Sequence, residues 1–171
     1  MATEASQPLK ISLPCSAALL NALYAEWVAG GIANGYAGTP AQYTFVKVNA
    51  AGNLDLIASQ ADVAIGVIQN APFIVANGAS QVAGTAGEVV VLGVTKVRVA
   101  AGAGLILNAS TPGNGIVVST TAGSVGCAVT SGGYVSSAGG KNVVGQALTA
   151  ANALDLVKAV VNCTLPLPIG A

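Results

Sequence analysis

Side chains that could perform acid–base chemistry are few and widely spaced in this sequence. No two carboxylates lie within six residues of each other along the chain: Glu4, Glu26, Asp55, Asp62, Glu88 and Asp155. General acid–base catalysis requires groups that are positioned together and have tuned pKa values. The spacing predicts no such pair.

Nucleophilic and metal chemistry also lack their usual partners. Ser and Thr are common, but the sequence has no histidine to activate a hydroxyl and no G-x-S-x-G motif. A serine activated by Lys96 or Lys158 is the one formal option that remains. A Cys–His zinc site is excluded for the same reason, and no G-K-[ST] follows the Gly-rich stretches. We therefore expect no enzyme activity, no cofactor and no metal.

The three cysteines, Cys15, Cys127 and Cys163, are odd in number, far apart and form no C-x-x-C motif. This pattern is typical of free, buried thiols in a reducing compartment.

The charge content is low and balanced. Only 7% of the residues are charged, with six Lys+Arg against six Asp+Glu, whereas about one-quarter is usual for a soluble domain. Without a basic field, nucleic-acid binding is not expected. Near-zero net charge favours association, so we expect an oligomer.

Residues 11–25 are uncharged, yet they do not form a convincing signal peptide or membrane span. Pro14 and Asn21 interrupt the apolar run, and Glu4 stands where a basic region is required. The run is also shorter than the roughly 20 residues that a span needs. We expect no membrane association.

Residues 1–40 predict an arm with one helix. "LKISLP" is a candidate strand, and "SAALLNALYAEWVAGG" has a helical apolar stripe: Leu19, Leu20, Leu23 and Trp27. Ser16 is the expected N-cap and Gly30–Gly31 the expected stop. The stripe either packs on the chain's own β-domain or contacts a partner subunit. Residues 31–40 are Gly-rich and predict a linker.

Residues 41–171 predict a β-domain. Short apolar runs separated by turn residues every 8 to 12 positions indicate a small barrel or sandwich of antiparallel strands. "YTFVKV" and "NLDLI", joined by "NAAG", predict a hairpin. The next strands are "VAIGVIQNA", "GEVVVLG", "TKVRVAA", "LILN", "GIVVS", "GCAVTSGGYVS", "NVVGQALTA" and "LVKAVVNCTL". We interpret residues 147–161 as strands rather than as a helix.

A weak internal echo accompanies these strands. "FVKVNAAGNLDLI" is similar in form to "LILNASTPGNGIVV", and each is followed by a strand with an internal glycine, Gly66 or Gly145. Chance similarity is the alternative. If real, the echo predicts two similar β-units that close a small barrel. A glycine inside a strand marks a bulge, a sharp bend or a close backbone approach. We expect Gly66 and Gly145 to let their strands bend tightly as the sheet curls.

Four segments in order resemble the capsid decoration, or cement, proteins of tailed bacteriophages. They are a "Y-x-F-V-K" strand (43–47), an "IGVxQN-x-P" strand (65–72), a "G-x-x-K-V…A-G" segment (93–102) and a "G-x-AL-x-AA…D-L-V-x-V-x-x-N" ending (145–162). The resemblance covers residues 41–163. Residues 1–40 and an insertion near 121–140 depart from it.

The resemblance implies a structural protein, often trimeric, that is made in the bacterial cytoplasm and binds the outside of the capsid. Its partners would be the major capsid protein and further copies of itself. Candidate contact residues are the stripe Leu19, Leu20, Leu23 and Trp27, the pair Lys96 and Arg98 on one strand face, and Tyr134 in a Gly-rich loop. A solvated face is the plainer interpretation of the Lys96/Arg98 pair. A phage-fibre or adhesin-type domain that binds a host glycan or protein is the alternative function, and exposed aromatic residues would favour it.

Overall fold

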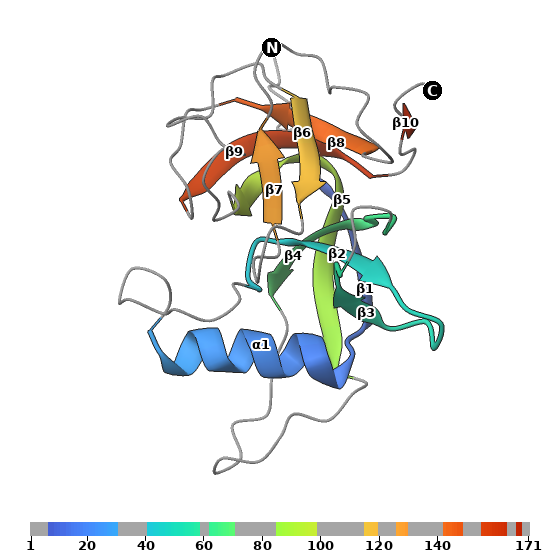
Figure 1. Cartoon of the computed structure of the whole chain (residues 1–171), viewed down its shortest axis with the longest axis vertical. Coiled ribbons are helices and arrows are strands. Elements are labelled where there is room, and N and C mark those ends of the chain that lie inside the picture. The colour runs from blue at the N-terminus through green and yellow to red at the C-terminus, as the bar shows by residue number, and fades with distance from the viewer. Residues whose placement is uncertain are drawn as a thin grey trace.

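The chain folds as a mainly β protein with one helix among the described residues (Figure 1). The computed structural model describes residues 7–30, 41–58, 62–70, 85–98, 115–119, 126–129, 142–148, 155–163 and 167–168. The elements are β1 (Leu9–Pro14), α1 (Ala17–Val28), β2 (Phe45–Val48), β3 (Leu54–Leu56), β4 (Gly66–Asn70), β5 (Ala86–Arg98), β6 (Gly115–Ser119), β7 (Gly126–Val129), β8 (Asn142–Ala147), β9 (Leu156–Asn162) and β10 (Leu167–Pro168). The predicted mainly β class is confirmed.

The strands form one antiparallel sheet in the order β3-β2-β4-β5-β9-β8-β6-β7, and β1 and β10 pair with β5 and β8. No pairing among the described strands joins β3 to β7, so the sheet is open, and the closed barrel, one of the two predicted arrangements, is not formed. Closure requires the two edge strands to meet, and nothing local in the sequence encodes that meeting.

The sheet order is symmetric about the β5–β9 pair. Strands β2 to β5 stand in the order β3-β2-β4-β5, and β6 to β9 stand in the mirrored order β9-β8-β6-β7. In Figure 1 the β6–β9 half lies above α1 and the β1–β4 half, and β5 runs between them. The internal repeat is therefore present in the topology. The hairpin of the second unit is formed by β6 and β7. The similarity within the sequence predicted this hairpin at residues 105–118, and its first strand, 105–108, lies outside the described residues.

The strand glycines of the two units hold equivalent positions. Gly66 in β4 pairs with Val46 of β2 and lies against β5, where an added Cβ would stand 2.5 Å from the Val90 carbonyl oxygen. Gly145 in β8 lies against β9 in the same way, and its Cβ would overlap the Val160 carbonyl oxygen. Both glycines therefore stand where another strand's backbone approaches closely, which is one of the alternatives for a glycine inside a strand, whereas the predicted role in bending the strand stays a prediction.

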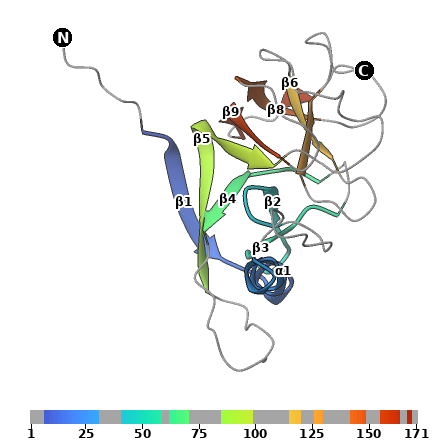
Figure 2. The same cartoon turned by 90° about the vertical axis from the view of Figure 1, so that its left-hand side faces the viewer.

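Strand β5 is continuous over the two segments predicted as separate strands at 87–93 and 95–101. It bends at Gly93, whose φ is +117°, and Figure 2 shows β1 beside its first half. β1 pairs with residues 86–92, and β9 takes over at residues 92–98. Gly93 therefore turns the strand without ending it. Residues 99–101 lie outside the described residues.

Helix α1 begins and ends as the sequence predicts. The Ser16 side chain accepts a hydrogen bond from the Leu19 amide at 3.1 Å, and Gly30 follows the helix with φ +76°. The predicted strand "LKISLP" is β1. The predicted linker at 31–40 lies outside the described residues.

The main core joins α1 to the sheet. Leu19, Leu20 and Leu23 are buried together with residues of β2, β3, β4 and β5: Val46, Leu54, Ile68, Val89 and Val91. Of the two alternatives for the apolar stripe, the structure has the one in which these leucines pack on the chain's own β-domain. Residues on both sides of the expected boundary at 40 thus share one core.

Candidate interaction surfaces

The first turn of α1 is attached to strand β3. The Ser16 amide donates to the Leu54 carbonyl oxygen at 2.7 Å, and the Ser16 hydroxyl donates to the Asp55 carboxylate at 2.6 Å. One serine therefore caps the helix and binds it to the sheet, so the helix start has a fixed position.

The last turns of α1 are held by a buried ion pair. Arg98 Nη2 of β5 lies 3.1 Å from Glu26 Oε1, and the two side chains are only 9% and 5% exposed. The other oxygen, Glu26 Oε2, accepts hydrogen bonds from the amides of Ala41 and Gln42 at 2.8 and 3.0 Å. Because a buried charge requires a partner and hydrogen bonds, this network ties the helix, β5 and residues 41–42 together.

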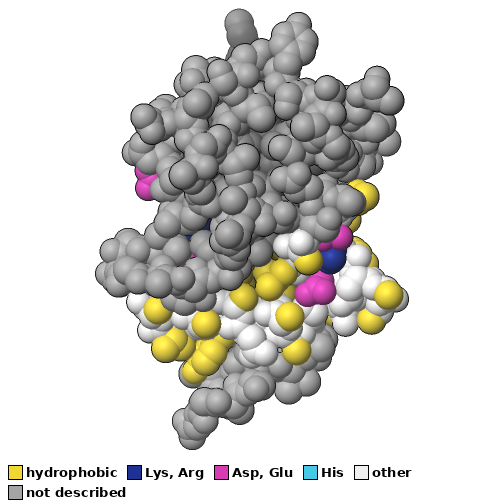
Figure 3. Space-filling model, in the orientation of Figure 1, with side chains coloured by type: hydrophobic (Ala, Val, Ile, Leu, Met, Phe, Trp, Pro, Cys, Tyr) yellow, Lys and Arg dark blue, Asp and Glu magenta, His cyan; other side chains and the backbone are white. Residues whose placement is uncertain are grey.

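Beyond this network the helix presents an apolar end, the helix-end surface, formed by Tyr24, Trp27 and Val28. Trp27 is 56% exposed and Val28 is 60% exposed. The Tyr24 and Trp27 rings stack with centroids 6.1 Å apart. The end of α1 projects beyond the strands in Figure 1, and Figure 3 shows hydrophobic side chains over it. The sequence indicates that Val28 belongs to this surface only by its position, directly after Trp27 and shortly before Gly30–Gly31.

A second surface is the outer face of the β5–β9 pair, here called the β5–β9 ledge: Leu92, Val94, Lys96, Leu156, Lys158 and Val160. On β9, exposed Lys158 and Val160 alternate with buried Val157, Ala159 and Val161. Of these residues, only Lys96 was predicted from the sequence as a contact residue. The strict alternation of apolar and other residues in "LVKAVVN" could have indicated the exposed face of β9.

The predicted contact residues therefore separate into three environments. Leu19, Leu20 and Leu23 are at most 5% exposed and belong to the core, whereas Trp27 and Lys96 lie on the surface. Arg98 is buried by its contact with Glu26, so the exposed face predicted for Lys96 and Arg98 is present only at Lys96. Sequence spacing alone could not reveal this, because Glu26 stands 72 residues away. Tyr134 lies outside the described residues.

The carboxylates of the described segments contact different partners. Asp62 binds Lys47 at 2.9 Å, and Glu88 binds Lys10 at 2.7 Å on an exposed site. Among the described residues, no group of three or more His, Cys, Asp or Glu side chains could hold a metal ion. No helix in this part of the chain is long and apolar enough to cross a membrane.

Two of the cysteines are free, buried thiols, as predicted. Burial raises the pKa of Cys15 from 9.0 to about 11 and that of Cys163 from 9.0 to about 12. Desolvation disfavours the thiolate, so both sulfurs stay protonated and unreactive near neutral pH.

The chain matches no known protein-family model and no curated protein.

Proposed function

We propose that the protein is a decoration protein that binds the outer surface of a tailed-phage capsid and stabilises the shell. The observation that carries the proposal is the exposed Trp27 beside Val28 on a helix fixed at both ends. A large apolar side chain on a rigid support loses little conformational freedom when a partner covers it. The resemblance to decoration proteins supplies the partner, the major capsid protein.

The segments that carry this resemblance support the proposal by their location. They include β2, β4, the second half of β5, and β8 with β9, and all of these belong to one sheet. A shared sheet is what a common fold would require. The helix-end surface, which lies outside those segments, is then the part of the chain free to differ with the capsid that it binds.

The proposed mechanism is additive binding over the shell. Covering a large apolar side chain contributes about 1.5 to 3 kcal/mol, which is weak for one copy. A homotrimer presents the surface three times, and simultaneous attachment raises the total affinity strongly. A ligand that binds the assembled state alone stabilises that state by mass action.

The first test is co-sedimentation with capsids built from the major capsid protein encoded in the same genome. The full chain is expected to sediment with these capsids, and Trp27→Ala to be retained at least fivefold less. Leu9→Ala is the matched control, because Leu9 is also an exposed apolar side chain, at 52%, and lies on β1 instead. Equal loss in both variants, or no binding by the full chain, would contradict the proposal. Sedimentation of the free chain at micromolar concentration is expected to give a trimer.

A glycan-binding role is the second candidate, and the stacked Tyr24–Trp27 pair favours it because sugar rings pack on exposed aromatic faces. Trp27 is the single tryptophan of the chain, so its fluorescence reports directly on anything that covers it. A shift of the Trp27 emission on adding host surface glycans, with no shift on adding capsids, would favour this function over capsid decoration.

A further inference from the structure

Strand β1 forms an open edge of the sheet. β1 and β9 pair with successive halves of one side of β5, and β9 pairs further with β8, whereas β1 has no second partner among the described strands. Figure 2 shows β1 at the margin of the molecule, with the other labelled elements on one side of it. An edge strand presents main-chain donors and acceptors to which another strand can pair.

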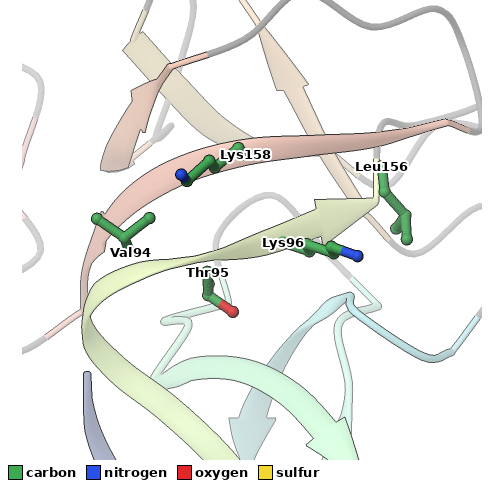
Figure 4. A pocket seen from close by; sticks show the side chains of 5 residues that line it. All are labelled: Val94, Thr95, Lys96, Leu156 and Lys158. Atoms are coloured by element: carbon green, nitrogen blue, oxygen red, sulfur yellow. The ribbon is translucent and has the colours of Figure 1, made fainter. Parts of the chain in front are cut away.

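The neighbouring hollow on the β5–β9 ledge is divided between two separate charges. Its volume is about 400 Å³, and it is lined by Val94, Thr95, Lys96, Leu156 and Lys158. Figure 4 shows the two lysine side chains extending in opposite directions along their strands, and Lys158 already has an interaction within the chain. The two ammonium groups therefore do not form one binding site, and the open edge of β1 is the surface that remains to be explained.

A hydrogen bond at the end of β1 shows which main-chain groups face the open side. The Cys15 amide donates to the Thr85 carbonyl oxygen, directly before β5, at 2.7 Å. Since neighbouring residues of a strand direct their main-chain groups to opposite sides, every second residue before Cys15 faces β5 as well. The residues between them face the open side: Lys10, Ser12 and Pro14. Because proline has no N–H, the open side offers the N–H and C=O groups of Lys10 and Ser12.

The sequence of this edge has the same pattern in both directions. In "PLKISLP", residues 8–14, proline and leucine recur at equal distances on either side of Ile11, and only Lys10 and Ser12 exchange places. When two such strands pair antiparallel about Ile11, Lys10 of each copy stands opposite Ser12 of the other, where each such pair exchanges N–H and C=O hydrogen bonds. Each lysine then faces a serine, so like charges, which destabilise a pair, do not stand opposite each other.

The side chains and the ends of the two strands match as well. Leu9 of one copy stands opposite Leu13 of the other, on the face that carries Ile11. Leu9 is 52% exposed, and Ile11 and Leu13 are only half-buried against the core, so pairing covers apolar surface that is open in a single copy. Pro8 stands opposite Pro14, and neither has an N–H that would be left without an acceptor.

We infer that β1 pairs with β1 of a second copy, antiparallel about a two-fold axis at Ile11, and extends the sheet across two subunits. Prolines on an edge strand limit pairing, and here they restrict it to a strand of the same length. A two-fold contact joins copies in pairs, so in the proposed homotrimer it connects neighbouring trimers. The inference is independent of capsid binding, because it involves neither Trp27 nor the helix-end surface. Leu9→Ala keeps the main-chain bonds of this edge and remains the control for capsid retention.

Cysteine cross-linking tests the register, with oxidised glutathione as the oxidant. The variants carry Cys127→Ser, because the other two cysteines are buried. Opposite residues of a non-hydrogen-bonded pair have Cα atoms about 4.5 Å apart, which a disulfide can span. Ile11→Cys is therefore expected to form a covalent dimer about fivefold faster than Leu9→Cys, although Leu9 is the more exposed residue. A mixture of Leu9→Cys and Leu13→Cys should link again. Linking of Leu9→Cys to itself at the rate of Ile11→Cys would overturn the register.

Sedimentation from about 10 to 500 µM measures the association itself, because so small a contact is weak and its population follows mass action. The mean mass of the full chain is expected to rise beyond the trimer as the concentration increases. Ser12→Pro removes an outward donor and keeps the bonds to β5, and Leu9→Lys places a charge opposite an apolar side chain, so each should weaken the association about tenfold or more.

The matched control is Val63→Lys, because Val63 is 51% exposed and lies outside β1. It should change the association by less than about twofold, the scale of a surface substitution away from the contact. Circular dichroism verifies that each variant is folded, and Leu9→Lys carries the test if Ser12→Pro is not. A mass of the full chain that does not depend on concentration, or an equal loss in Val63→Lys, would refute the inference and leave the capsid proposal to its own tests.

Discussion

At the scale of single residues, the tightest constraints come from glycines inside strands. Gly66 and Gly145 have no room for a Cβ, whereas Gly52 has φ +82° in the β2–β3 turn and nothing within 4 Å of an added Cβ. Glycine is required at positions 66 and 145 because a Cβ does not fit there, and it is favoured at position 52 because the backbone φ is positive. The sequence indicated a special role for Gly66 and Gly145 because they interrupt β-like runs.

Gly66→Ala is expected to lower the free energy of unfolding by more than about 2 kcal/mol, the scale of overpacking in a filled core. The added Cβ would overlap Val89 Cγ1 and meet the β5 backbone at 2.5 Å. Urea denaturation measures the change. Gly52→Asn is the control, since Asn tolerates positive φ and the site is open, and we expect a loss of less than about 1 kcal/mol there. A smaller loss for Gly66→Ala than for the control would contradict the close approach.

The buried thiols predict loss of stability in alkali. Because the folded-state pKa values of about 11 for Cys15 and about 12 for Cys163 lie above the ordinary 9.0, the folded state binds more protons above pH 9. The contribution of the two protonated thiols to the free energy of unfolding is complete below pH 9. It decreases as the pH rises toward 11 for Cys15 and 12 for Cys163, by at most about 1.4 kcal/mol per pH unit for each thiol.

Thermal melts between pH 8 and 11 test this contribution. The variant Cys15→Ala/Cys163→Ala should start less stable and lose less stability as the pH rises. Parallel curves for the variant and the unmodified chain would show that other groups cause the alkaline loss.

At the scale of elements, helix α1 serves both the core and the surface. Its leucines are buried with the sheet, while Trp27 at its end is exposed. The Ser16–Asp55 and Glu26–Arg98 contacts fix its two ends. The helix and its caps could be predicted from local signals. Its burial could not, because the partners of the leucines stand far away in the sequence.

Leu20→Ala is expected to lower the free energy of unfolding by about 2 to 5 kcal/mol, the range for deleting a buried leucine side chain. Trp27→Ala, on the same helix, should change it by less than about 1 kcal/mol because the ring is 56% exposed. Chemical denaturation of both variants makes the comparison. A large loss for Trp27→Ala would mean that the ring supports the fold instead of a partner.

At the scale of the whole molecule, two β-units share the β5–β9 pair at the centre of one open sheet. The class, the hairpin at "NAAG" and most strand positions followed from period-2 alternation and turn residues. Three features did not: β5 as one strand, the open sheet and the burial of Arg98. Gly93 has the signature of a turn but bends a continuous strand. The edge pairings and the Arg98–Glu26 contact depend on residues distant in sequence.

Deleting residues 1–38 should therefore unfold the chain, because it removes β1 and the buried face of α1 together. Far-ultraviolet circular dichroism of the truncated chain is the measurement. A folded, cooperatively melting 39–171 fragment would show that the sheet is stable without the helix, contrary to the shared core.

The measurement that tests capsid stabilisation most directly is the temperature at which undecorated capsids break, determined with and without a saturating amount of the chain. We expect a higher breaking temperature with the full chain and with Leu9→Ala, because binding to the intact shell stabilises the shell by mass action. Trp27→Ala at the same concentration should give a clearly smaller rise. An unchanged breaking temperature with the full chain bound, or an equal rise with Trp27→Ala, would contradict capsid stabilisation through the helix-end surface.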